Sequence, residues 1–411
     1  MVFSLSSHNV IQYLHDAGLC SSEDGASADA ELPESSNNCN FLVTLADRRK
    51  LLVKQERCND NDGTPHEFFN EWLFHQLLQQ FPVLGNIRAI ASIVLHFDEE
   101  NSILVSKYLT EYLDLASFYQ KNNVFESDIA TAIGTTLAAL HRATFNHKEY
   151  RDFMATAPQG QFRYNFYNPA QGVESITPEI FGTVPTDALK FYLLYQHYDS
   201  LESAIAELAY EWQPCCLTHN DLKLENILVH SRWDQLDNCL VRMIDWEACS
   251  WGDPAYDLGT VLAGYLKIWL DSLVVDPTIE LEESMHLAVT PLEIIQPSIL
   301  ALTRAYLNAF PMILEYRSEF ILRVVQFVGL ALMQQIQESI KYRKYFDNIG
   351  ICMLKVAKSL LTIPQQSVRT VFGVSESEIL EPLPKFEKIP KAEKEQNLVR
   401  LYYQKTRLRG C

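Results

Sequence analysis

The chain has 411 residues, too many for one small domain, which predicts a two-lobed domain or two domains with appendages. Hydrophobic residues make up 47% and charged residues 21% of the chain, so there is enough apolar material for a large core. The net charge of −18 argues against a broad basic surface, and we therefore expect no nucleic-acid partner and no binding to anionic membranes.

The first hundred residues predict a small α+β lobe. Residues 1–36 are expected to form a short helix, at 9–18, and a polar loop. Residues 37–108 are expected to form the small lobe itself. Period-two and helical apolar patterns predict its four strands and one helix, in chain order, at residues 41–45, 51–53, 66–80 (the helix), 90–97 and 102–108.

After residue 108 the pattern becomes helical, and a helical lobe is predicted over residues 109–365. A short β-like patch at 227–229 and 241–244 interrupts it. Residues 366–411 are interpreted as a C-terminal extension, whose last part is rich in Lys and Arg. Apolar residues at helical spacing predict helices at residues 129–141, 187–210, 255–273, 292–315 and 319–345.

Targeting and redox features favour a cytoplasmic protein. The amino terminus has no basic start and no sustained apolar run, so it does not resemble a signal peptide. The most apolar stretch, Val324 to Met333, is shorter than the roughly 20 apolar residues that span a bilayer, and it is predicted to be a buried helix. The nine cysteines are scattered without Cys-x-x-Cys pairs, which predicts neither a disulfide framework nor a zinc site.

Acidic and amide side chains gather between residues 217 and 257. Asp221 and Asn226 lie in a loop that leads into a strand, and Asp245 ends the next strand, so a hairpin can bring all three together. Asn and Asp oxygens suit Mg²⁺, which keeps water and phosphate oxygens at its other positions. The remaining carboxylate can accept a proton from an attacking hydroxyl. This set therefore fits phosphoryl transfer.

The same segment resembles the protein-kinase-like superfamily. His219, Asp221 and Asn226 match the catalytic-loop pattern His-x-Asp-x-x-x-x-Asn. The Asp-Trp-Glu that begins at Asp245, and the Gly-Asp-Pro-x-x-Asp-Leu that begins at Gly252, resemble the aminoglycoside phosphotransferase and choline kinase branch. The resemblance implies a bilobal α+β protein-kinase-like fold, with a small, mostly antiparallel β lobe and a larger, mainly helical lobe.

The resemblance also implies roles in the helical lobe. Asp221 would be the base or the carboxylate that orients the hydroxyl, and Asn226 with Asp245 would hold Mg²⁺. Lys223 is the residue type that protein Ser/Thr kinases use at this place to steady the transferring phosphate. Asp257 would brace the catalytic loop by accepting backbone N–H bonds, and His219 is expected to pack and to bond the loop backbone rather than to move protons.

In the small lobe, the resemblance implies a nucleotide site. Lys54 would contact the α- and β-phosphates. Its partner would be a Glu of the following helix, where Glu71, on the apolar stripe, is preferred to Glu67. Backbone groups around Lys107 and Leu109 would hold the adenine.

The loop before Lys54 departs from the glycine-rich pattern of protein kinases. A polar segment that includes Ser36 and Asn38 takes its place and would lie over the phosphates. The nucleotide implied is ATP, with GTP as the alternative, because this loop differs. Only a short segment separates Asp245 from Asp253, so regulation by an activation segment is not expected.

Simpler structural roles stand beside these assignments. The acid and amide set could be an ordinary turn cluster, and Lys54 and Lys223 could be solvent-facing lysines. The acidic run at residues 271–283 could hold a cationic acceptor, but a solvated loop face is the preferred interpretation. Cys215 and Cys216 are expected to be small core residues.

The sequence therefore predicts a Mg²⁺-dependent kinase that transfers the γ-phosphate of ATP to a hydroxyl acceptor, by family default a small molecule. One alternative is a Ser/Thr kinase acting on a ribosomal precursor peptide, in lanthipeptide-type tailoring with a partner lyase. Lys223 and the basic tail favour it, whereas the lack of an activation segment argues against it. The other alternative is a non-catalytic pseudokinase that uses its cleft to bind another protein.

Overall fold

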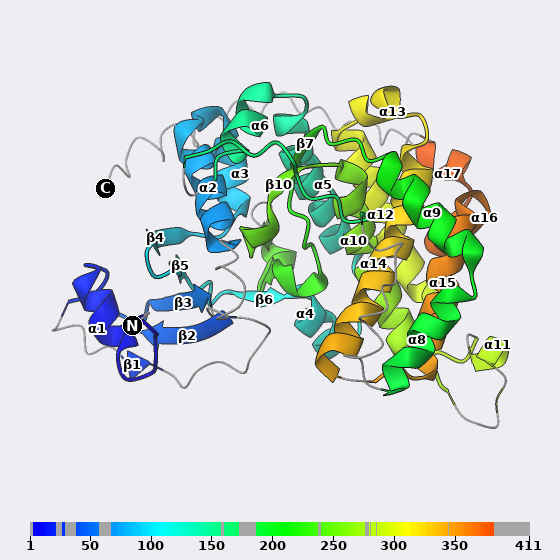
Figure 1. The fold of residues 1–411 in the computed structure, drawn as a ribbon, viewed down its shortest axis with the longest axis horizontal. Coiled ribbons are helices and arrows are strands. Elements are labelled where there is room, and N and C mark those ends of the chain that lie inside the picture. Colours follow the sequence, from blue (N-terminus) through cyan, green and yellow to red (C-terminus); the bar gives the residue numbers. More distant parts are fainter. Residues whose placement is uncertain are drawn as a thin grey trace.

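The computed structural model consists of a small part built around a β-sheet and a larger part that is mostly helical (Figure 1). The predicted two-lobed α+β architecture is confirmed. The structure describes residues 3–21, 27–28, 38–56, 67–157, 160–171, 186–236, 240–275, 279, 281–284, 286–343 and 345–381.

The small lobe contains a five-stranded sheet in the order β1-β2-β3-β5-β4, with every neighbouring pair antiparallel. The predicted strands lie in this sheet. Strand pairing begins at Val94 rather than at residue 90, because Ile90 ends a short helix whose Ile87 is buried in the large core. The strands are β1 (Ser27–Ala28), β2 (Asn38–Thr44), β3 (Lys50–Glu56), β4 (Val94–Asp98) and β5 (Ile103–Lys107).

One face of this sheet is covered by the amino-terminal helix α1 (Val10–Asp16). Leu5, Val10 and Leu14 form a separate core with the alternate strand residues that point toward the helix, namely Phe41, Val43, Leu51, Val53, Ile103 and Val105. Because successive strand side chains point to opposite faces, Lys54 points away from this core. The burial of Val53 thus sets the direction of the predicted nucleotide-binding lysine.

Helix α2 (Glu67–Gln80) joins the two parts of the molecule. Its Trp72 stacks on Phe97 of β4, with ring centroids 5.9 Å apart. Its Phe74 and Leu77 belong instead to the large hydrophobic core. The 3₁₀ turn η1 (Pro82–Leu84) and helix α3 (Gly85–Ile90) then lead back to the sheet.

The helical lobe agrees in most places with the predicted helices, but two long predicted segments are divided. The segment 187–210 breaks at residues 197–198, and 292–315 breaks at Pro311, which has no backbone N–H to continue a helix. The helices are α4 (Leu115–Asn122), α5 (Ser127–Thr144), α6 (Lys148–Met154), α8 (Thr186–Gln196), α9 (Asp199–Tyr210), α10 (Pro254–Asp271), α11 (Leu281–Ser284), α12 (Leu292–Ala309), α13 (Met312–Tyr316), α14 (Phe320–Arg343), α15 (Asn348–Thr362), α16 (Pro364–Phe372) and α17 (Glu376–Leu380).

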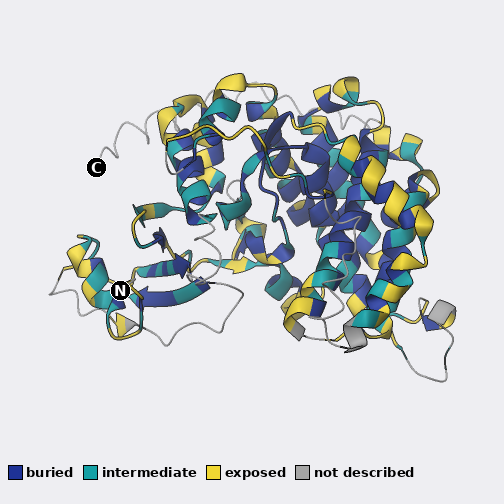
Figure 2. Ribbon diagram, in the orientation of Figure 1, coloured by how far each residue is buried: buried dark blue, intermediate teal, exposed yellow. Residues whose placement is uncertain are grey.

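Buried residues concentrate in α10 and α14, in the middle of the helical lobe (Figure 2). Among the described helices, α14 alone is long and apolar enough to cross a membrane, and 72% of its most apolar window is buried within the protein. Its packing is that of a core helix, as the sequence predicts. The predicted boundary at residue 365 lies inside α16, whose Val368 and Phe372 are buried in the same core.

Two small antiparallel sheets lie where the lobes meet. Strands β6 (Tyr112–Asp114), β8 (Ile227–His230) and β9 (Val241–Met243) form one, and β8 and β9 are the predicted hairpin. Strands β7 (Cys216–Thr218) and β10 (Ser250–Gly252) form the other. The predicted catalytic loop connects β7 to β8, so both of its ends are fixed by strand pairing.

Candidate active site

One buried carboxylate fixes the start of the catalytic loop. Asp257, on the first turns of α10, accepts the backbone N–H of His219 at 2.7 Å and that of Asn220 at 2.8 Å. Its Oδ2 also lies 3.1 Å from Nε2 of His141, whose Nδ1 lies 2.9 Å from the hydroxyl of Tyr306. Asp257 and His141 are fully buried, so this network fixes the start of the loop. The contacts are those predicted for Asp257.

Asp221 lies at the surface of the loop with one carboxylate oxygen held by two donors. Its Oδ2 accepts the side-chain amide of Asn226 at 2.9 Å and lies 3.0 Å from Nζ of Lys223. The amide of Asn226 also donates to the backbone carbonyl of Asp221, at 2.8 Å. The carboxylate is therefore oriented by groups within six residues of itself, and Asp221 lines a cavity.

The β8–β9 hairpin brings Asn226 next to the residues that follow β9; the sequence predicts that Asp245 ends this strand, but β9 ends at Met243, two residues earlier. The backbone N–H of Ile244 donates to the carbonyl of Asn226 at 3.0 Å. The side chain of His219 also contacts Ile244, with its Nε2 2.9 Å from the carbonyl oxygen of that residue. Asp245 itself has φ of 69°, a left-handed conformation that Asp tolerates better than most residues. Asp245 directly precedes the 3₁₀ turn η4 (Trp246–Ala248).

Lys54 and Asp245 form an ion pair between the small sheet and the hairpin. Burial lowers the pKa of Lys54, but the charges of Asp245, Glu71 and Glu247 outweigh it and raise that pKa above its usual range. Burial raises the pKa of Asp245, and Lys54 reverses this and holds it below its usual range. Both side chains are thus charged, and together they join the lobes.

Glu71 is the buried glutamate of α2. Its Oε1 accepts the hydroxyl of Ser92 at 3.1 Å and lies 3.9 Å from Nε2 of His75. Burial raises the pKa of Glu71 to about 7, against the favourable charge of Lys54. The direct ion-pair partner of Lys54 is Asp245, and Glu71 acts on it as a nearby charge. Glu67, the less favoured alternative, lines the cavity instead.

Trp246 connects α2 to the catalytic loop. Its fully buried ring stacks on Phe74 at 4.1 Å and lies 4.4 Å from the ring of His219. Its indole N–H donates to the carbonyl of Met243 at 2.9 Å. The Trp of the Asp-Trp-Glu motif therefore fixes Asp245 between the two lobes, and His219 has the packing role that the sequence predicts.

The oxygen donors around Asp245 suit a divalent cation. Asn226 uses its amide nitrogen for Asp221, which leaves its amide oxygen for a metal, and Asp245 supplies a carboxylate. The next acid, Glu247, has a buried Oε2 without a partner in the described part of the chain. Burial and then the charge of Asp245 raise the pKa of Glu247 to about 8. No group of three or more His, Cys, Asp or Glu side chains suited to a metal occurs within the described ranges, so an ion here would also need phosphate or water oxygens.

The remaining predicted residues lie around the hinge and the sheet. The backbone N–H groups of Lys107 and Tyr108 donate to Ile93 and Lys50. The N–H of Leu109 forms no backbone hydrogen bond with another described residue. Asn38 begins β2 and is buried, and Ser36 lies outside the described residues.

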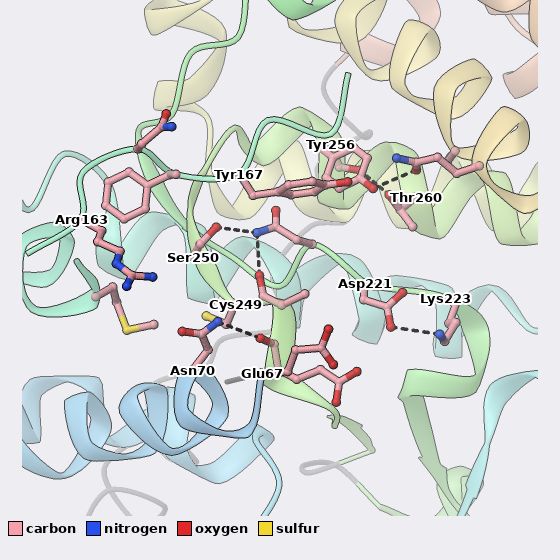
Figure 3. A pocket seen from close by; sticks show the side chains of 18 of the residues that line it. Glu67, Asn70, Arg163, Tyr167, Asp221, Lys223, Cys249, Ser250, Tyr256 and Thr260 are labelled. Carbon is pink, nitrogen blue, oxygen red and sulfur yellow. Dashed lines mark hydrogen bonds and ion pairs between the residues drawn. The ribbon is translucent and has the colours of Figure 1, made fainter. Parts of the chain in front are cut away.

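A cavity of about 800 Å³ opens beside Asp221 and Lys223 (Figure 3). Tyr167 and Tyr256 lie on the side of the catalytic loop opposite α2, which contributes Glu67 and Asn70. Further lining residues come from α14, and sequence reasoning missed them because their polar side chains look like ordinary surface positions of an amphipathic helix. They are Gln334, Gln335, Gln337, Glu338 and Lys341.

Of the acidic run that begins at Asp271, the side chains of Asp271 and Glu283 are described, whereas Asp276 and Glu280 lie outside the described residues. Asp271 pairs with Lys267 on the exposed side of α10, and neither Asp271 nor Glu283 lines the cavity. This agrees with the solvated loop face preferred from the sequence. The basic tail from Lys385 to Arg409 lies outside the described residues.

The fold is similar to solved kinase structures. A choline/ethanolamine kinase family protein from Mesorhizobium loti is 16% identical, with a TM-score of 0.45, over 86% of this chain and 95% of that one. The choline kinase LicA from Streptococcus pneumoniae is 15% identical, with a TM-score of 0.42, over 86% and 98%. The ADP-bound aminoglycoside phosphotransferase APH(2'')-Ib is 12% identical, with a TM-score of 0.40, over the same shares.

No curated protein matches the chain. The sequence model of the phosphotransferase enzyme family matches residues 30–283, which is more than half of the 411 residues. The match includes strands β2 to β5 of the small sheet, the catalytic loop and the Asp-Trp-Glu turn described above. The chain therefore belongs to the phosphotransferase enzyme family.

Proposed function

We propose that this phosphotransferase is a Mg²⁺-dependent kinase that moves the γ-phosphate of ATP to a hydroxyl group of a small molecule. The observation that carries the proposal is the position of Asp221, held by Asn226 and Lys223 at the wall of a cavity of about 800 Å³. That volume is within the range of small-molecule sites. A carboxylate at such a place can orient an alcohol and accept its proton.

Each charged residue of the site has one role in the proposed transfer. The acceptor oxygen forms a bond to the γ-phosphorus, the bond from that phosphorus to the β–γ bridging oxygen breaks, and the proton of the acceptor passes to Asp221. Lys223, beside Asp221, would offset negative charge on the transferring group, and Lys54 would leave Asp245 to contact the nucleotide phosphates. Asn226 and Asp245 would hold the Mg²⁺, which neutralises phosphate charge when bound.

Two alternatives predict different behaviour. A peptide kinase would modify Ser or Thr of a co-expressed precursor peptide, and a pseudokinase would bind a partner without transferring phosphate. The pseudokinase alternative is weakened because Lys54, Asp221, Asn226 and Asp245 are all present and the ion pair and hydrogen bonds join them.

The test is a thermal-shift measurement with ATP, with and without Mg²⁺. We expect ATP with Mg²⁺ to raise the melting temperature of the parent protein. Asp245→Ala should remove the Mg²⁺-dependent part of this increase, because it removes a metal ligand and the partner of Lys54. Asp271→Ala, on the exposed side of α10, is the matched control and should respond like the parent. No shift in the parent, or an unchanged shift in Asp245→Ala, would count against the proposal.

A further inference from the structure

The wall of the cavity opposite the catalytic loop includes a short arm, residues 160–168, that the sequence analysis left unassigned. The arm folds back on the end of α6. The backbone N–H of Arg163 donates to the carbonyl of Ala155 at 2.7 Å, and Thr156 forms an antiparallel bridge with Phe162. These contacts set the direction of the arm, so its alternate side chains have different surroundings.

One set of side chains lies outside the cavity. Phe162 and Tyr164 stack on each other with ring centroids 6.4 Å apart, and neither lines the cavity. Arg151, from α6, lies over the ring of Tyr164 at 5.6 Å. Arg163 points to the cavity between these two rings in the sequence, and farther along the arm Asn165, Phe166 and Tyr167 line the cavity as well.

Arg163 is the cation of this wall. Its side chain forms no ion pair and no hydrogen bond with any of the residues that the structure describes. Figure 3 shows it across the view from Asp221 and Lys223, with its guanidinium directed toward the cavity. An unpaired guanidinium facing a cavity offers several donors in a fixed plane that matches a carboxylate or a phosphate.

The acids of the cavity belong to its catalytic side. The pKa of Glu67 is raised by burial and by Glu56 and Asp245, with Lys341 as the cation that opposes them. The pKa of Glu338 is raised by burial, with Lys223 as the cation that opposes it. The cations that act on these two acids are therefore Lys223 and Lys341.

We propose that Arg163 binds an anionic group of the acceptor, a carboxylate or a phosphate, at the end remote from the hydroxyl that is phosphorylated. The inference rests on the proposed function and narrows its substrate class. In a chain with a net charge of −18, a long-range field would repel such an acceptor, so a local cation is needed to select it. Tyr167 lines the same cavity but extends toward Tyr256, on the side of Asp221 (Figure 3).

The test uses three matched pairs of hydroxylated probes in which only the anionic group differs. Gluconate is compared with sorbitol, pantothenate with panthenol, and glycerol 3-phosphate with glycerol. Binding to the full chain is measured by isothermal titration, with and without ADP and Mg²⁺. The first two pairs report on a carboxylate and the third on a phosphate.

We expect at least one anion to bind about tenfold or more tightly than its neutral partner. Arg163→Gln should abolish that preference, and Arg163→Lys should restore part of it. Arg151→Gln removes the same charge near the arm but outside the cavity. This variant should therefore prefer the anionic probe over the neutral one to the same extent as the parent. The melting temperature of each variant checks that it is folded.

Three results would overturn the inference: neutral probes bind as well as the anions in all three pairs, the preference survives in Arg163→Gln, or no anion binds at millimolar concentration. The thermal shift with ATP and Mg²⁺ is independent of these probes. If ATP with Mg²⁺ raises the melting temperature of the parent but the parent shows no anion preference, the proposed kinase activity stands and only the assigned acceptor class is wrong.

Discussion

Lys54 and Asp245 lie 191 residues apart in the sequence and form the ion pair that connects the two lobes. Their side chains are only 15% and 21% exposed. In the proposed reaction both residues turn to the nucleotide, Lys54 to phosphate and Asp245 to the metal. The ion pair therefore fixes the positions of these two side chains relative to each other before a nucleotide binds.

Breaking this pair should destabilise the protein. Lys54→Met leaves Asp245 mostly buried without its cation, and we expect the free energy of unfolding to fall by about 2 kcal/mol, less than for a fully buried pair. The double variant Lys54→Met/Asp245→Asn removes both charges and should recover part of this loss. Urea denaturation measures the two single variants, Lys54→Met and Asp245→Asn, and the double variant. Additive losses would show that the two residues are not coupled.

Asp257 should be needed for both stability and activity. Asp257→Asn keeps the shape but presents one oxygen where the carboxylate presents two to the N–H groups of His219 and Asn220. We expect a loss of about 1–3 kcal/mol in unfolding free energy, and slower phosphate transfer because the loop is less fixed. Denaturation and turnover are measured together, with Asp271→Asn as the exposed control. Unchanged turnover in a destabilised Asp257→Asn would limit this residue to a structural role.

Gly134 lets α5 and α12 approach closely. A Cβ added there would lie 2.1 Å from the carbonyl oxygen of Leu302, which as backbone has little freedom to move. Gly134→Ala should therefore destabilise the protein by about 1–3 kcal/mol despite the better helix propensity of Ala. Gly85→Ala meets nothing within 4 Å and has helical dihedrals, so it should be neutral or slightly stabilising. Equal melting temperatures for both variants would contradict this packing.

His75 should make the stability of the protein depend on pH. Burial and then the charge of Arg88 lower the pKa of His75 to about 4 in the folded protein. The contribution of neutral His75 to the free energy of unfolding is complete above the unfolded pKa of about 6.5. It is lost as the pH falls through about 4, and the free energy of unfolding then changes by about 3 kcal/mol. His75→Gln should flatten the dependence of unfolding free energy on pH in this window. An equally steep profile in the variant would assign the effect to other groups.

Much of the site could be predicted from the sequence because its residues are close together in the chain. Asp221 and Asn226 share one loop, and the hairpin that follows brings Asp245 beside them through strand pairing. The direction of Lys54 follows from the alternation of buried residues on β3. In each case a local pattern determines the geometry.

The acceptor side could not be predicted in this way. Arg163, Tyr167 and Gln334 come from an irregular arm and from a distant helix, and only tertiary packing brings them to one cavity. The ion pair of Lys54 with Asp245, rather than with Glu71, also depends on how the lobes meet. The helix breaks near residues 197 and 311 were missed because continuous apolar spacing hid them.

In the proposed reaction Asp221 serves the chemistry of phosphate transfer. This role is tested by the rate of ADP formation from ATP with Mg²⁺, in water alone and with candidate acceptors, for the parent and for Asp221→Asn. We expect the rate to fall by about 10²- to 10⁴-fold in the variant, while its melting temperature and its thermal shift with ATP stay close to those of the parent. Equal rates in the two proteins would contradict it.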